Sequence, residues 1–257
     1  MACIICGSHN NTKKVSDYFE PDKYEKYVGI DRIRRSWKRC GGCGIYRQYR
    51  NYKIEVLNSI YKNGYRDKKF RGETIENAFN RIMLIPLESS ENKQRVEWLK
   101  DVLPMTEGTM LDVGSGIGVF PFLMKDEWDV TCVEENADSI LFINSKLGMP
   151  CVEQVKDEKF DLVTLVHVLE HIEDLGDFLA KIYKHTHEFL FVEVPDADEF
   201  AYLPKEHDEF NSCHEWFFTM PTLVKLLEDN GFTVLDATRK YYEERQLSRL
   251  LVFAQCG

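Results

Sequence analysis

The sequence predicts an α/β protein built on a doubly wound, mostly parallel sheet, with a small N-terminal module in front of it. From residue 109 onward, seven short apolar runs alternate with segments of helical periodicity. Such alternation is typical of a parallel sheet covered by helices on both faces. Ahead of these runs stand two Cys-x-x-Cys pairs, in a segment too small to fold without a staple.

Size and composition limit the class of protein. The chain has 257 residues, of which 44% are hydrophobic, enough for one large domain plus a small module. No apolar run approaches the roughly 20 residues of a membrane span. The first residues, Met-Ala-Cys-Ile-Ile-Cys, do not have the basic and long apolar regions of a signal peptide. We therefore expect a cytoplasmic protein, whose eight cysteines are metal ligands or buried thiols.

Charge is divided unevenly along the chain. The net charge is −10, yet residues 1–72 carry 17 basic and 7 acidic residues. A basic module on an acidic domain suggests an anionic partner near the front of the chain. Ordinary solvated charge on a small module explains the same numbers equally well.

Four cysteines at the N-terminus form a candidate metal site: Cys3, Cys6, Cys40 and Cys43. Two thiolates separated by two residues can bind one ion, and four of them complete a tetrahedral zinc site. The spacing resembles a zinc ribbon. The long connection between the pairs predicts a hairpin, with strands at 24–33 and 36–39. A redox role for the cysteines is the alternative.

Residues 45–88 interleave aromatic and basic side chains, and we expect mainly helix there, with a loop near Asn63-Gly64. Such a stretch can bind nucleic acid or pack as a linker against the main domain. The predicted division is a zinc module at 1–53, a helical linker at 54–88 and the main domain at 89–257. Ser90 should cap a helix that ends before Pro104.

The predicted elements of the main domain follow in order. The strands are 109–113, 130–134, a weak one at 151–153, 160–166, 189–194, 232–238 and 250–255, and the last two form a hairpin. The helices are 119–125, 137–146, 177–185 and 219–230. Ligands of such sheets bind at the carboxyl ends of the strands.

The first of these strands leads into a glycine-rich turn. Gly114, Gly116 and Gly118 alternate with other residues, which lets the backbone turn tightly and approach a ligand. The dinucleotide-binding pattern G-x-G-x-x-G fails, because Val119 occupies its last position. Glu134 ends the next strand, about where an acidic residue meets a ribose. A plain glycine-rich turn with a chance acid downstream is the alternative.

This arrangement resembles the class I S-adenosylmethionine (SAM)-dependent methyltransferases, which have a Rossmann-like fold. The resemblance implies that the glycine loop holds the methionine part of SAM, that Glu134 binds the ribose hydroxyls, and that a residue near His167 lines the pocket. The implied SAM-binding residues are Asp112, Gly114, Ser115, Gly116, Gly118, Glu134 and His167.

The whole chain also resembles a narrower group with an N-terminal zinc ribbon, which includes C-methyltransferases of nucleotide-linked deoxysugars. In that group, a histidine after the fourth strand and a Glu-His pair in a late loop act as acids and bases. His171 and His214 match the histidines. Cys213 stands where the group has its Glu, so Glu215 is the nearest substitute.

Methyl transfer from SAM is an in-line displacement that needs alignment and, for a hydroxyl or carbon acid, a base. We expect His171 or His214 to remove the acceptor proton, oriented by Glu215 or Glu170. The expected acceptor is small and anionic, such as a nucleotide-linked sugar or a surface-polysaccharide precursor. The alternatives are an RNA methyltransferase that holds nucleic acid through its basic module, and a SAM-binding subunit without catalysis. The sequence leaves open whether carbon, oxygen or nitrogen is methylated, and which oligomer forms.

Overall fold

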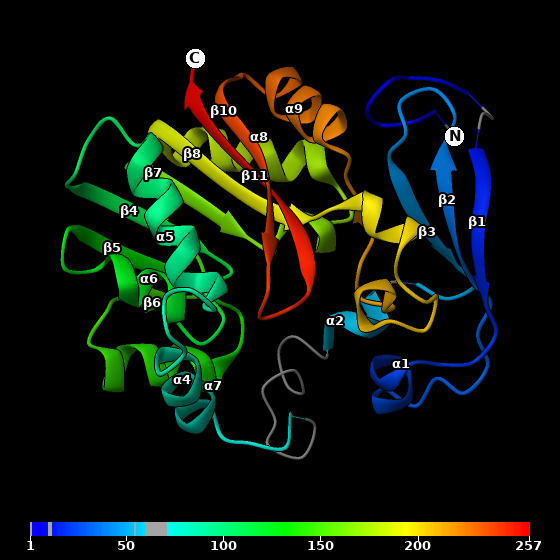
Figure 1. The fold of residues 1–257 in the computed structure, drawn as a ribbon, viewed down its shortest axis with the longest axis horizontal. Coiled ribbons are helices and arrows are strands. Elements are labelled where there is room, and N and C mark those ends of the chain that lie inside the picture. The colour runs from blue at the N-terminus through cyan, green and yellow to red at the C-terminus, as the bar shows by residue number, and fades with distance from the viewer. Residues whose placement is uncertain (1, 10–11, 54, 60–70) are drawn as a thin grey trace.

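A computed structural model describes residues 2–9, 12–53, 55–59 and 71–257, which form two sheets (Figure 1). The larger sheet has seven strands in the order β10-β11-β8-β7-β4-β5-β6. Strand β11 runs opposite to the other six strands and so pairs antiparallel with β10 and β8, whereas the remaining pairs are parallel. The mostly parallel, doubly wound sheet that the sequence predicts is therefore confirmed. Its strands, in chain order, are β4 (Gly108–Val113), β5 (Trp128–Val133), β6 (Cys151–Val152), β7 (Phe160–Val166), β8 (Thr186–Pro195), β10 (Phe232–Tyr242) and β11 (Leu247–Cys256).

Side chains alternate between the two faces of this sheet, as the period of a strand requires. In β11, Leu250 and Val252 join one core, whereas Leu251 and Phe253 join the other. The first core packs against α8 (Leu175–His185) and α9 (Met220–Asp229). The second packs against α4 (Ile75–Met83), α5 (Glu91–Val102), α6 (Val119–Met124) and α7 (Ala137–Phe142).

Helix ends follow the predicted signals. Ser90 caps α5 by accepting a hydrogen bond from the Lys93 backbone N–H at 3.3 Å, and Thr219 forms a capping box at the start of α9. The predicted helix 137–146 changes character part-way. Its final turn, Ile143–Leu147, is π-helical and ends at Gly148 in the left-handed conformation.

The smaller sheet has the strand order β1-β2-β3-β9, with β1 (Thr12–Tyr18), β2 (Arg35–Cys40) and β3 (Tyr46–Arg50) from the N-terminal module. The predicted strand at 36–39 is confirmed. The predicted strand at 24–33 is wrong, because Asp22 caps a short helix, α1 (Lys23–Tyr27). The strand β1, which sequence reasoning missed, has a largely exposed face and hence little apolar pattern.

The predicted helical character of 45–88 holds only in part. Residues 46–50 are strand, whereas α2 (Glu55–Ser59) and α4 are helical. The predicted loop at Asn63-Gly64 lies outside the described residues. Tyr46 and Tyr49 belong to a sheet because β2 offers paired backbone groups alongside them.

The fourth strand of the smaller sheet comes from the other end of the chain. The strand β9 (Trp216–Phe217) belongs to the long loop after β8 and pairs with Tyr46 and Arg47 of β3. An aromatic cluster fills the space behind it, with the Trp37 and Phe217 rings 5.1 Å apart. The N-terminal sheet and the late loop therefore fold as one unit. No helix among the described residues is long and apolar enough to cross a membrane.

We predict that Gly118→Ala destabilises the fold more than Gly148→Ala, by about 1–3 kcal/mol. Both glycines have a left-handed backbone, with φ of 78° and 68°, so each substitution carries a conformational cost of about 1–2 kcal/mol. A Cβ at Gly118 would also lie 2.9 Å from side-chain atoms of Ile143 and Leu147, whereas one at Gly148 meets nothing within 4 Å. Urea unfolding of the two variants measures the difference. Equal destabilisation would show that the Ile143 and Leu147 side chains move aside without a cost in stability.

Candidate active site

The glycine loop turns between β4 and α6. The backbone N–H groups of Gly114 and Ser115 both donate to the carbonyl of Val133, at 2.8 and 3.1 Å. Gly114, Gly116 and Gly118 all have positive φ, at 75°, 60° and 78°. A Cβ at Gly114 would lie 2.7 Å from a methyl group of Val168. The backbone of the turn thus requires glycine at these positions.

Two carboxylates flank this loop. Glu134 follows β5, and its carboxylate accepts hydrogen bonds from the backbone N–H groups of Gly116 at 2.7 Å, Asn136 at 2.9 Å and Glu135 at 3.0 Å. Asp112 is buried within β4 and accepts from the Thr164 hydroxyl at 2.6 Å. Burial raises the pKa of the Asp112 carboxyl to about 6.

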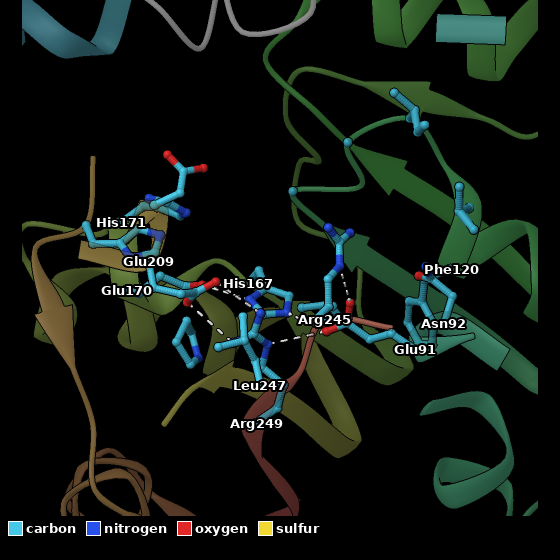
Figure 2. Close-up of a pocket in the computed structure, with 18 of the residues that line it drawn as sticks. Glu91, Asn92, Phe120, His167, Glu170, His171, Glu209, Arg245, Leu247 and Arg249 are labelled. Atoms are coloured by element: carbon cyan, nitrogen blue, oxygen red, sulfur yellow. Dashed lines mark hydrogen bonds and ion pairs between the residues drawn. The ribbon is translucent and has the colours of Figure 1, made fainter. Parts of the chain in front are cut away.

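A cavity of about 640 Å³ opens at the carboxyl ends of the strands (Figure 2). Its lining comes from the glycine loop, the end of β7, the N-terminus of α5, the late loop at 207–214 and the β10–β11 hairpin, and Tyr24 contributes from the N-terminal module. Among the predicted site residues, the structure places Asp112, Gly114, Ser115, Gly116, His167, His171 and His214 on this lining. Gly118, Glu134 and Glu215 are not part of it.

His167 lies at the centre of a buried ionic network. Its Nδ1 is 3.1 Å from Glu170, and its Nε2 is 3.2 Å from Glu193 and 3.5 Å from Glu91. Burial alone would lower the pKa of His167, but the hydrogen bonds to Glu170, Glu193 and Glu91 outweigh it and raise the pKa well above its usual value. Figure 2 shows Glu170 and His171 on one side of His167 and Glu91 on the other.

Two arginines complete the network, one from α5 and one from β11. Arg95 of α5 makes a two-pronged ion pair with Glu193 of β8, while Arg249 of β11 reaches Glu91 at 3.3 Å and Glu209 at 3.2 Å. Each buried carboxylate therefore has a cationic partner, which buried charge requires. This network fixes the floor of the cavity and holds His167 in place.

His171, which follows β7, and His214, in the late loop after β8, lie side by side in the structure. Their ring centroids are 4.7 Å apart. The Nδ1 of His171 bonds the Cys213 carbonyl at 2.9 Å. Burial lowers the pKa of His214 to about 3, so its imidazole is neutral. The carboxylate beside the two rings is that of Glu170.

Glu215 lies elsewhere. Successive side chains of an extended segment point to opposite sides, and the Glu215 carboxylate forms a buried ion pair with Arg50 of β3. Burial raises the pKa of this carboxyl, against the opposing effect of Arg50. Arg50 also donates to the Ser212 and His214 carbonyls, at 3.1 and 3.4 Å.

Other residues of the N-terminal module hold the same loop. Arg35 donates to the Phe210 carbonyl at 2.6 Å, and Gln48 donates through its side chain to the Asn211 carbonyl at 2.9 Å. The loop in turn donates from the Glu215 N–H to the Glu170 carbonyl at 2.7 Å. The N-terminal module thus positions the segment that carries His214 against the segment that carries His171.

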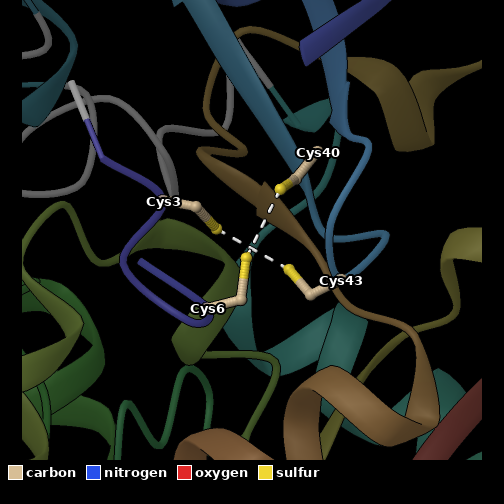
Figure 3. Close-up of side chains that lie close together, drawn as sticks. All are labelled: Cys3, Cys6, Cys40 and Cys43. Carbon is tan, nitrogen blue, oxygen red and sulfur yellow. Dashed lines mark hydrogen bonds between the residues drawn. The ribbon is translucent and has the colours of Figure 1, made fainter. Parts of the chain in front are cut away.

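The four predicted cysteine ligands converge (Figure 3). Sulfur atoms of Cys3 and Cys43 lie 3.6 Å apart, and those of Cys6 and Cys40 lie 3.7 Å apart. In a tetrahedral site with Zn–S bonds of about 2.3 Å, the sulfurs are about 3.8 Å apart. A Cβ at Gly42 would come within 3.0 Å of the Cys6 sulfur, so this turn leaves room only for glycine.

Comparison with known proteins agrees with this geometry. Residues 87–237 match the family described as "Methyltransferase domain". The chain belongs to this methyltransferase family. No curated protein matches the chain.

Solved structures support the fold. The methyltransferase resembles magnesium protoporphyrin IX methyltransferase from Synechocystis PCC 6803 with bound SAH (S-adenosylhomocysteine), with a TM-score of 0.58 and 14% identity over 78% of this chain and 100% of the other. It also resembles 1,6-didemethyltoxoflavin-N1-methyltransferase from Burkholderia thailandensis, with a TM-score of 0.55 and 16% identity over 86% and 95%. A putative methyltransferase in complex with the Trm112 activator of Haloferax volcanii gives a TM-score of 0.56 and 11% identity, over 71% and 95%.

Sequence reasoning missed the groups that hold the site together, chiefly Arg50, Arg95, Glu193 and Arg249. The pairs Arg50–Glu215 and Arg95–Glu193 join residues far apart in the chain, so no local spacing reveals them. Glu193 carried one signal, since it is a charged residue inside the apolar run Phe189–Val194. A buried charge in a strand implies a buried partner.

We predict that Arg50→Ala costs about 3–5 kcal/mol of stability, because it leaves the buried Glu215 carboxylate unpaired. Arg47→Ala, on the same strand, removes cation–π contacts with the Trp216 and Tyr49 rings, at 4.8 and 5.8 Å, and a longer-range attraction to Glu215, and should cost about 1 kcal/mol. Chemical denaturation measures both. Adding Glu215→Gln to Arg50→Ala should recover part of the loss. If Arg50→Ala and Arg47→Ala were equally stable, Arg50 would not be the anchor of this loop.

Proposed function

We propose that this SAM-dependent methyltransferase transfers the methyl group to a small acceptor bound in the 640 Å³ cavity, next to Glu170, His171 and His214. The observation that carries the proposal is the shape of the lining. The glycine loop forms one part of it and the paired histidines another, so donor and acceptor would meet in one cavity. A cavity of this size suits a cofactor and a small molecule together.

For the donor, the proposed binding residues are those of the glycine loop with Asp112 and Glu134. The carboxylate of Glu134 already accepts from the Gly116 N–H, so it stands beside the turn that approaches the ligand. Hydroxyl groups of a ribose can donate to such a carboxylate. In this proposal, His167 shapes the pocket from within its ionic network and takes no part in proton transfer.

For the chemistry, SAM is already activated, and the protein must align the acceptor and exclude water. His214 lines the cavity with a neutral imidazole, whose free ring nitrogen can accept a hydrogen bond from a hydroxyl or N–H group of the acceptor, while its low pKa makes it a weak base by itself. His171 lies beside it with its ring fixed by the Cys213 carbonyl. Glu215 serves this site through Arg50, by holding the loop.

The charged residues of the lining bear on the charge of the acceptor. The lining contains six carboxylates and three arginines, so the cavity as a whole does not select an anion. Arg71 and Arg245 are its exposed cations. An anionic acceptor, such as a nucleotide-linked sugar, would place its phosphates against these two side chains and its reacting group near the histidines.

We further propose that Cys3, Cys6, Cys40 and Cys43 bind one structural zinc ion, within a module of residues 1–53 that residues 54–88 join to a transferase domain at 89–257. The sulfur separations fit the ion, and the chemistry of four thiolates suits zinc. In this role the ion fixes β2 and β3, and through them the late loop.

Removal of zinc should loosen the late loop. We predict about one zinc per chain by elemental analysis, bound tightly enough to survive dialysis. Extraction with a strong chelator should release the module, because metal binding and folding of such segments are coupled. Hydrogen exchange of residues 208–217 would then rise, while β4 and β7 stay protected. Unchanged exchange after complete extraction would show that the cysteines do not support the loop.

We predict that Glu134→Gln weakens SAH binding at least tenfold, because a charged acceptor for the ribose hydroxyls contributes about 1.5–3 kcal/mol. Glu135→Gln is the matched control, since Glu135 is adjacent and exposed. Calorimetric titration of both variants with SAH provides the measurement. Equal affinities would remove Glu134 from the cofactor site.

The acceptor class is tested with labelled SAM and separate fractions of nucleotide sugars, lipids, small metabolites and RNA. Label should enter a small-molecule fraction and should fall at least a hundredfold with the His171→Ala, His214→Ala double variant. Label in RNA would favour the alternative in which the basic N-terminal module holds nucleic acid. SAM binding without label in any fraction would indicate a non-catalytic subunit.

A further inference from the structure

Glu170, His171 and His214 together have the donor set of a metal site. One ligand atom from each lies within 4.8 Å of the other two. All three residues line the cavity, and two of them, Glu170 and His214, are buried. Two imidazoles and one carboxylate are typical ligands of divalent transition metals such as iron and zinc.

Two buried atoms of this cluster have no hydrogen-bond partner. They are the Oε2 of Glu170 and the Nδ1 of His214. Leaving a buried polar atom unpaired costs about 1–3 kcal/mol. Two such atoms on adjacent side chains of one cavity point to a ligand that both of them share.

The other ligand atoms are oriented as metal ligands usually are. The Nδ1 of His171 bonds the Cys213 carbonyl at 2.9 Å, which fixes the tautomer whose Nε2 carries a lone pair. The Oε1 of Glu170 contacts the Nδ1 of His167 at 3.1 Å, so that histidine holds the carboxylate in place. These contacts match the outer shell that orients histidine and carboxylate ligands around an ion.

Two other groups in the described part of the chain offer similar donors and are less suitable. Around His167, the carboxylates of Glu91 and Glu193 are already neutralised by Arg95 and Arg249. The group of Asp161, His187 and Glu188 is on the surface, and its His187 side chain is 58% exposed. An ion would displace an existing cation in the first group and would compete with water in the second.

We propose that Glu170, His171 and His214 bind one divalent transition-metal ion, which activates a hydroxyl of the acceptor. The inference rests on the proposed function, since it assigns this ion to the acceptor end of the same cavity. It concerns a second metal site, separate from the cysteines.

In this proposal the ion, and not a free histidine base, promotes loss of the proton from the acceptor hydroxyl. A coordinated hydroxyl has a lower pKa and releases its proton to solvent. The oxygen lone pair then forms the new O–CH₃ bond, the bond between the methyl carbon and sulfur of SAM breaks, and its electron pair stays on sulfur to leave neutral SAH. The proposal therefore selects an oxygen acceptor.

The binding test uses Mn²⁺ with the full-length protein, because Mn²⁺ prefers oxygen and nitrogen ligands and does not compete for a tetrathiolate site. We expect the protein to bind one Mn²⁺ per chain, measured as the loss of the electron paramagnetic resonance signal of free Mn²⁺. Glu170→Gln and His214→Ala should each weaken binding at least tenfold. His187→Ala is the control for the exposed group and should bind as the wild type does.

Retained SAH binding and thermal melting show that each variant folds. Equal Mn²⁺ affinity in the wild type, Glu170→Gln and His214→Ala would overturn the proposal, and so would the absence of Mn²⁺ and Zn²⁺ binding beyond the ion at the cysteines.

Turnover separates this proposal from the proposed function. With an identified acceptor, mild chelation that leaves the thiolate zinc in place should lower the rate at least tenfold, and Mn²⁺ or Zn²⁺ should restore it. Full activity after verified removal of the second ion would overturn the metal assignment and leave the methyltransferase assignment intact. A bound ion with no labelled product in any fraction would support the metal assignment and overturn the methyltransferase assignment.

Discussion

The buried ion pair between Arg50 and Glu215 is the contact on which the active-site arrangement depends. One guanidinium group binds a side chain and two backbone carbonyls of the late loop, at a depth where an unpaired charge could not remain. The two-residue strand β9 adds few hydrogen bonds of its own. Without this anchor, the contacts from Arg35 and Gln48 would remain, but a buried charge would be left unpaired beside His214, which would be held less firmly opposite His171.

The ionic network around His167 holds the other wall of the cavity in place. It joins α5, β8, β11 and the turn after β7 through charges that neutralise one another. Buried ion pairs contribute little net stability, yet they fix geometry well. In this protein they lie where two connections must meet at a defined separation.

Local patterns in the sequence predicted the local parts of the molecule. The strand at 160–166, the capped helix after Ser90 and the turn at Gly114 all follow from composition and spacing over a few residues. Pairing between strands far apart in the chain could not be predicted from such local patterns. The strand β1 has an exposed face, and residues 46–50 become a strand only because β2 lies beside them. The histidines after β7 and in the late loop were identified from a resemblance. The approach of His214 to Glu170, and its support by the Arg50–Glu215 pair across 165 positions of the chain, follow from no local pattern.

The shared sheet of N-terminal and late-loop strands has a thermodynamic consequence. Cys40 at the end of β2 and Trp216 of β9 pack into the same hydrophobic core, so the cysteine cluster and the cavity wall are parts of one cooperative unit. Coupling of this kind is reciprocal. With zinc on the thiolates, as proposed, a ligand that tightens the wall would also tighten the binding of the ion by the same free energy, and oxidation of the thiols would weaken the binding of the ligand. The cysteine cluster would then make the occupancy of the cavity sensitive to the redox state of its surroundings.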